Sequence, residues 1–206
     1  ADRMELFLAV RDALAEPRAA LEDTVADLES DAGRGGVLGG FKAARSVIGM
    51  APLIVELIGA RDQALLDHGM GLGEYTWIYW LTYTAWLGHP ADESALHEFF
   101  EARSAEDESF DMHLEGMETE RLTWRIRSDV TAMLESLARE LENVPEREAL
   151  RQAVASELAA LEADPARVPF QDGLADALAE GLEPYRERLE ATYSRAANPF
   201  ELGQLD

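Results

Sequence analysis

The chain of 206 residues contains no cysteine, which excludes disulfide bonds, thiolate metal sites and cysteine nucleophiles. Positive charge is scarce as well: 18 basic residues stand against 41 acidic ones, and the formal net charge is −23. Nucleic acids and anionic lipid surfaces are bound through positive charge, so we expect neither as a partner. The acidity is typical of a solvated surface, and the alternative is a protein that binds cations or basic proteins.

Long hydrophobic runs are also missing. Spanning a bilayer takes roughly 20 apolar residues, and we find no such transmembrane segment and no signal peptide. The sequence begins with Ala1 rather than Met, as exported chains do once a leader has been removed. Cytosolic fragments begin in the same way, so this start only slightly favours an exported or periplasmic protein, including a lipoprotein, over a cytoplasmic one.

Catalytic motifs are absent too. The sequence has no GxSxG or SxxK frame for a serine nucleophile and no HExxH zinc motif. Gly35 and Gly40 have the spacing of a phosphate-binding loop, but Phe41 occupies the position of the required lysine. We therefore expect a protein that is not an enzyme.

What the sequence has instead is a concentrated aromatic stretch from Gly73 to Gly88. It holds three of the four tryptophans and three of the five tyrosines, with no charge after Glu74. At about 100° per residue, a helix here is apolar on every side, and such a helix is buried. The stretch predicts a buried central helix over residues 74–87.

The remaining segments carry helical periodicity, so we predict an all-α, single-domain bundle of seven to nine helices over residues 1–206. Its apolar heart is residues 41–88, and residues 198–206 form a loose tail. Gly33 to Gly40 is expected to be a flexible connection, and Pro52 to kink or restart its helix. The other expected helical segments are 2–30 (divided at Pro17), 41–65, 90–103, 119–141, 145–161 and 174–193 (interrupted at Pro184).

The aromatic helix supplies the candidate ligand site. Three tyrosines and a tryptophan fall on one face, and rings with convergent hydroxyls are typical of small-molecule pockets. Two carboxylates adjoin the apolar block and would have a raised pKa if buried. The candidate ligand-binding residues are Glu56, Glu74, Tyr75, Tyr79, Tyr83 and Trp86, and the alternative is that the rings are core and the carboxylates are exposed.

A metal site is the second hypothesis. His97 has Glu93 and Glu101 at i−4 and i+4, which places all three on one helical face. Asp111 and His113 lie in residues 104–118, whose path the sequence leaves open. In so acidic a chain a histidine near glutamates is expected by chance. No cofactor is required by the sequence, and a divalent metal would be the one to fit these side chains.

These observations predict a soluble, non-enzymatic helical protein that binds a small molecule or a protein partner near helix 74–87. One alternative is a metal-dependent enzyme that uses His97 and His113 with nearby carboxylates. Another is an acidic interaction protein for a basic partner.

Overall fold

The computed structural model describes residues 3–32, 37–90 and 119–196. Every regular element in these residues is helical and none is a strand, so the predicted all-α class is confirmed for the part that is described. Three of the expected segments, residues 90–103, 104–118 and 198–206, lie wholly or almost wholly outside the described residues.

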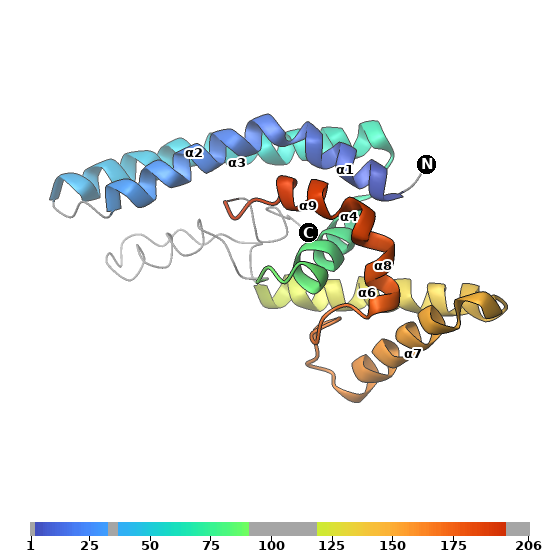
Figure 1. The fold of residues 1–206 in the computed structure, drawn as a ribbon. Coiled ribbons are helices and arrows are strands. Elements are labelled where there is room, and N and C mark those ends of the chain that lie inside the picture. The colour runs from blue at the N-terminus through green and yellow to red at the C-terminus, as the bar shows by residue number, and fades with distance from the viewer. Residues whose placement is uncertain (1–2, 33–36, 91–118, 197–206) are drawn as a thin grey trace.

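The first three helices form a long arm. Helices α1 (Arg3–Ala13) and α2 (Ala15–Ala32) follow one another along α3 (Val37–His68), as Figure 1 shows. Their facing sides are apolar, with Phe7, Leu14 and Leu21 fully buried. This arm covers one side of the aromatic stretch.

The second half of the chain covers the other side. Helix α6 packs on α4, α7 folds back along α6, and the chain then returns through α8 to bring α9 beside α1 (Figure 1). The elements of this part are α4 (Leu72–Tyr79), the π-helix η1 (Trp80–Trp86), α6 (Thr119–Leu141), the 3₁₀ turn η2 (Pro145–Arg147), α7 (Glu148–Ala163), α8 (Asp176–Leu182), the 3₁₀ turn η3 (Glu183–Tyr185) and α9 (Arg186–Thr192).

The N-terminal helix pair is divided three residues before Pro17. The break lies at Leu14, and Pro17 falls in the first turn of α2. A proline has no N–H and its ring clashes with the carbonyl four residues earlier, so it is tolerated in a first turn and not in a helix interior. Of the two predicted arrangements, two helices or one kinked helix, the structure shows two helices.

The glycine-rich connection is shorter than predicted. Helix α3 begins at Val37, so Gly39 and Gly40 are helical rather than part of a flexible connection. The helix then continues through Pro52 to His68, so it does not restart at the proline. It ends in a glycine cap: Gly69 has a φ of 62°, and the Met70 amide donates to the Leu65 carbonyl.

The aromatic stretch is helical, as predicted, but its second half is wider than an α-helix. The π-helix η1 follows α4 directly, and the Leu87 amide donates to the Thr82 carbonyl five residues earlier. The Thr82 hydroxyl donates back to the Ile78 carbonyl at 2.8 Å, a contact that bends helices. Gly88, with a φ of 78°, ends the element.

Candidate functional site

Three tyrosines form the centre of the molecule. Tyr75, Tyr79 and Tyr83 lie on one side of the α4–η1 helix, and all three are buried. Their rings follow one another with centroid distances of 6.4 Å and 4.6 Å, and Phe7 of α1 lies 5.2 Å from the Tyr75 ring. The buried aromatic cluster predicted around this helix is therefore present.

Arg11 of α1 enters this cluster as a buried cation. Its guanidinium donates to the Tyr75 hydroxyl at 3.0 Å and to the backbone carbonyl of Thr192. Its Cζ atom also lies 5.3 Å and 5.2 Å from the ring centroids of Tyr79 and Tyr83. Aromatic faces attract a cation, so the rings replace part of the water that burial removes. The cluster thus fixes α1 against both the aromatic helix and α9.

A second arginine lies beside the first. Arg18 of α2 donates to the Thr192 carbonyl at 2.7 Å and to the Arg11 carbonyl. Burial, together with the neighbouring charge of Arg11, lowers the pKa of Arg18 to about 10. The two arginines therefore join α1, α2 and the end of α9 at one carbonyl group.

A polar edge continues the cluster toward the end of α9. The Tyr83 hydroxyl lies 2.9 Å from Thr192 Oγ1, which itself lies 3.0 Å from the Arg188 carbonyl. The two hydroxyls share a hydrogen bond in which either oxygen can be the donor. Beyond it, the rings of His89 and Tyr193 stack at 3.6 Å with an interplanar angle of 11°.

The other predicted ligand residues lie apart from this cluster. Glu56 is exposed on α3. Glu74 is partly exposed and pairs with Arg3 through two hydrogen bonds, one of them 2.6 Å long. Trp86 is half-buried, and its ring lies 4.3 Å from the guanidinium carbon of Arg186. The structure therefore groups the three tyrosines and separates them from both carboxylates.

The predicted metal residues all lie outside the described residues; they are Glu93, His97, Glu101, Asp111 and His113. Within residues 3–32, 37–90 and 119–196, no group of three or more histidine, aspartate or glutamate side chains is arranged to hold a metal ion.

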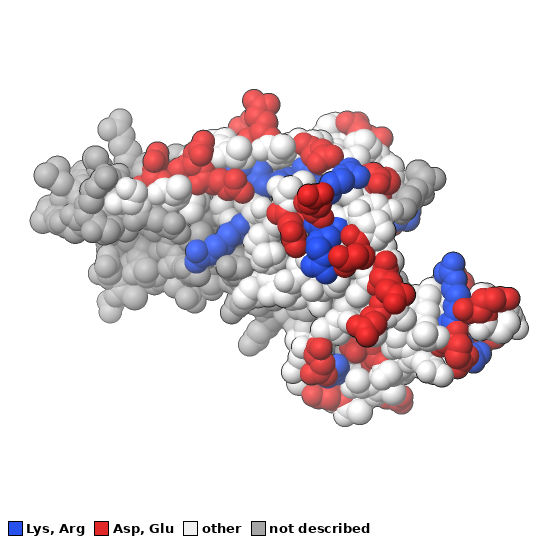
Figure 2. Space-filling view, viewed as in Figure 1, with Lys and Arg blue, Asp and Glu red and all other residues white. Residues whose placement is uncertain are grey.

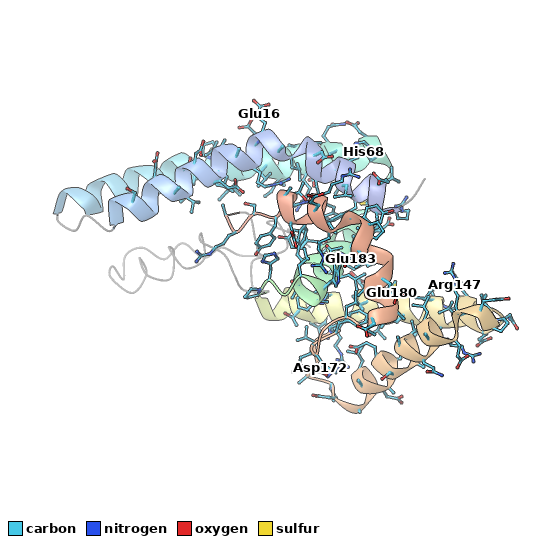
Figure 3. The ribbon with its side chains drawn as sticks, viewed as in Figure 1. Glu16, His68, Arg147, Asp172, Glu180 and Glu183 are labelled. Atoms are coloured by element: carbon cyan, nitrogen blue, oxygen red, sulfur yellow. The ribbon has the colours of Figure 1, made fainter. Side chains whose placement is uncertain are left out.

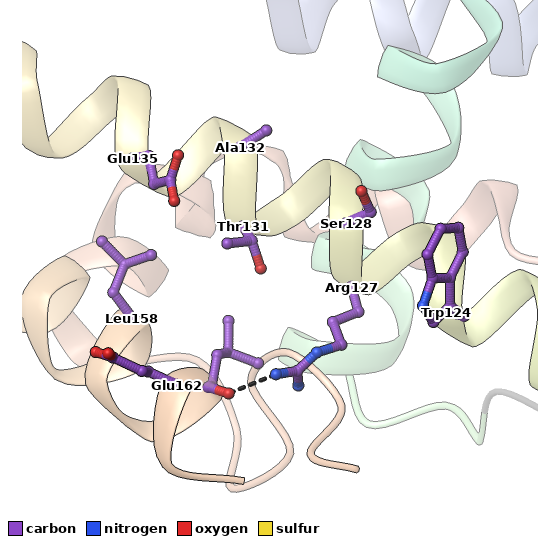
Figure 4. A pocket seen from close by; sticks show the side chains of 9 residues that line it. Trp124, Arg127, Ser128, Thr131, Ala132, Glu135, Leu158 and Glu162 are labelled. Carbon is purple, nitrogen blue, oxygen red and sulfur yellow. Dashed lines mark hydrogen bonds between the residues drawn. The ribbon is translucent and has the colours of Figure 1, made fainter. Parts of the chain in front are cut away.

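A groove between α6 and α7 forms a hollow with a volume of about 790 Å³. Figure 4 shows Trp124 at one end and Glu135 at the other, with Thr131 between them on α6 and Leu158 on α7. The indole of Trp124 is 70% exposed, whereas the other three tryptophans are buried or half-buried. An exposed tryptophan beside a concave surface is typical of a binding site.

Among the described residues that line this groove, Arg127 is the one basic residue, and backbone carbonyls hold its side chain. Arg127 donates from one Nη atom to the Leu161 carbonyl, in the last turn of α7 (Figure 4). The other Nη atom donates to the Arg167 carbonyl. Carbonyls in a last helical turn have no partner within the helix, and a cation there is favourable. Arg127 therefore caps α7 and ties it to α6, which fixes the width of the groove at this end.

A smaller hollow of about 280 Å³ lies between α2 and the segment after α9. Tyr193 and Ser194 line one side of it, and Glu22 and Val25 of α2 line the other. Ser194 is 2% exposed, and its hydroxyl has no hydrogen-bond partner in the described part of the chain. An unsatisfied buried hydroxyl costs about 1–3 kcal/mol, so a ligand that satisfied it would gain affinity.

Sequence reasoning missed the buried arginines and the groove. Phe7, Arg11, Leu14, Arg18 and Leu21 follow one another at three- and four-residue spacing, so the arginines share the buried face of the N-terminal helices. A basic residue in register with an apolar stripe was the available signal. Nothing in the local pattern marked the groove, because it forms between two helices.

The comparisons with known proteins identify no relative. No protein family, no curated protein and no solved structure matches the chain. Among the helices that are described, none is both long enough and apolar enough to cross a bilayer.

Proposed function

We propose that the protein is a non-enzymatic interaction protein that binds a helical segment of a partner protein in the groove between α6 and α7. The groove itself, with exposed Trp124 at its end, is the observation that carries this proposal. The opposite side of α6 packs on α4, so the groove lies one helix away from the aromatic helix.

The composition of the groove supports a protein segment as the ligand. Aliphatic and aromatic groups from Trp124, Ala132, Leu158 and Leu161 alternate with polar groups along two helices. A helix that lays its apolar face into such a groove is a recurring mode of peptide recognition. The hollow is open rather than enclosed, whereas small-molecule sites bury most of their ligand. Tyr75, Tyr79 and Tyr83 are buried against α1 and the end of α9, and none of them lines the groove.

Site-specific photocrosslinking in the source organism tests the proposal. Ser128 is exposed and lines the groove, whereas Ser156 is exposed on α7 and does not line it. We expect p-benzoylphenylalanine at position 128 to form one defined adduct with another protein, and the same group at position 156 to form none. Peptide mapping of the adduct then identifies the bound segment.

The Trp124→Ala variant is the control for specificity. Because Trp124 supplies exposed apolar area at the end of the groove, its removal should abolish the adduct from position 128 without lowering the amount of folded protein. Equal adducts from positions 128 and 156, or none from either, would overturn the proposal.

The hollow at Ser194 favours a second candidate function, the binding of a small molecule with a hydrogen-bonding group and an apolar part. Since the hydroxyl has no partner among the described residues, Ser194→Ala should leave the free energy of unfolding unchanged or raise it. A compound that raises the melting temperature of the natural protein but not of Ser194→Ala would support this function. If the substitution alone destabilised the protein by more than about 1 kcal/mol, the hydroxyl would have a partner and this candidate would fail.

A further inference from the structure

We infer that the segment bound in the groove is a cationic amphipathic helix, an inference that rests on the proposed function and names its partner class. Three features of the groove support it: the spacing of its residues on α6, the carboxylates at one end and the hydrogen bonds of Arg127.

The spacing on α6 matches a helical partner. Trp124, Ser128, Thr131 and Glu135 lie at intervals of four, three and four residues and so share one face of the helix. From Trp124 to Glu135 the helix rises roughly 16 Å, which is about three turns. A partner helix of that length presents apolar residues at positions i, i+3 or i+4, and i+7, which is enough to cover the aliphatic lining.

The carboxylates at the Glu135 end of the groove determine which net charge the partner segment should carry. Glu135 of α6 and Glu162 of α7 line the groove at this end, and both are exposed (Figure 4). Neither carboxylate forms an ion pair with a residue in the described ranges. Arg139, one turn further along α6, directs its Nε–H to the backbone carbonyl of Glu135 at 3.1 Å.

Arg127, the basic residue that lines the groove, does not neutralise these two carboxylates. Both Nη groups of Arg127 donate to backbone carbonyls, so this side chain is held at the end of α7. The protein as a whole carries a formal net charge of −23, and Figure 2 shows acidic side chains spread over the viewed face. An anionic helix would therefore meet repulsion both locally and at long range, and a cationic one would be steered toward the groove.

Binding of synthetic peptides to the full chain tests the inference. The probe is a fluorescent leucine–lysine peptide of about 18 residues, apolar along one helical face, and its anisotropy is measured in about 0.15 M salt so that distant charges are screened. The control peptides are a leucine–glutamate peptide of the same pattern and a scrambled leucine–lysine peptide. We expect the amphipathic cationic peptide to bind at least about tenfold more tightly than either.

Two double variants that lose the same charge show where the peptide binds. The first removes the groove carboxylates by Glu135→Gln and Glu162→Gln. The second removes two exposed carboxylates that do not line the groove, by Glu16→Gln and Glu180→Gln (Figure 3). We expect the first pair to weaken binding by about tenfold and the second by less than about twofold. Trp124→Ala should weaken binding by about tenfold without changing its dependence on salt.

The outcomes separate this inference from the function on which it rests. Equal losses from the two pairs, equal binding of the leucine–glutamate peptide, or no binding of the leucine–lysine peptide would each overturn a cationic partner. If crosslinking from position 128 identifies a partner segment without basic residues, the proposed function stands and this inference fails. If crosslinking fails, the proposed function falls whatever the peptides do.

Discussion

Trp80 provides the sharpest test of how the aromatic helix holds the fold. It lies at the start of the π-helix and is 3% exposed. Its indole N–H donates to the Pro169 carbonyl at 3.1 Å, so the same side chain fills the core and anchors the loop between α7 and α8. Replacing it with alanine removes both contributions.

The expected decrease in the free energy of unfolding follows from these two contributions of Trp80. Truncating a buried tryptophan to alanine costs roughly 3–5 kcal/mol, including the cavity that is left. The Pro169 carbonyl also loses its donor, at a cost of about 1–3 kcal/mol. We expect a total of about 5 kcal/mol, a large part of the roughly 5–15 kcal/mol that stabilises a domain.

Urea unfolding followed by circular dichroism measures the effect. With a slope of about 2 kcal/mol per molar urea, Trp80→Ala should lower the midpoint by about 2–3 M. Trp80→Phe keeps most of the ring volume and loses the N–H, so its loss should be about 1–3 kcal/mol. Trp124→Ala, at an exposed position, should cost less than about 0.5 kcal/mol. If Trp80→Ala lowered the midpoint no more than Trp124→Ala, the assignment of this ring to the core would be wrong.

Two further predictions concern the tyrosine cluster. Tyr83→Phe and Thr192→Val each remove the hydrogen bond between these side chains, so each should lower the free energy of unfolding by about 1 kcal/mol. The double variant should lose less than the sum of the two, and a double-mutant cycle of urea midpoints measures the difference. Burial raises the pKa of Tyr75 and Tyr79 above the ordinary value of about 10, so the stability that their neutral forms contribute is complete below pH 10 and is lost as the pH rises further. The lowered pKa of Arg18 has the opposite effect, because it adds stability as the pH rises above about 10. Replacing Tyr75 and Tyr79 with phenylalanine should therefore reduce the loss of stability between about pH 10 and 12, and a variant with the same alkaline unfolding curve as the natural protein would contradict the assigned shifts.

Several helix bounds could be predicted because their signals are local. Gly88 ends the aromatic stretch, and Pro145 begins the turn that leads into α7, as their sequence contexts indicate. On α6, apolar residues recur every four positions at Ile126, Val130 and Leu134, and all three are buried. These features follow from backbone chemistry and from helical periodicity, which a single segment carries within itself.

The candidate site was less predictable because it depends on contacts between distant segments. Arg11 meets Tyr75 across 64 residues and Thr192 across 181, and no short window of sequence contains both partners. Tyr75 and Tyr83 were candidate ligand residues, with a place in the core as the alternative, and their hydroxyls bond to Arg11 of α1 and Thr192 of α9.

By itself, the sequence determined the helical class, the buried aromatic helix and the acidic surface. Each of these depends on residue type and on spacing along the chain, so it can be predicted without knowing which other segment of the chain packs against it. Only the tertiary structure decided that the tyrosines enclose Arg11, that Trp124 stays in solvent and that α6 and α7 leave a groove between them. The physical reason is that periodicity gives the face of a helix that is buried, whereas the neighbour that covers this face is set by the packing of the whole chain.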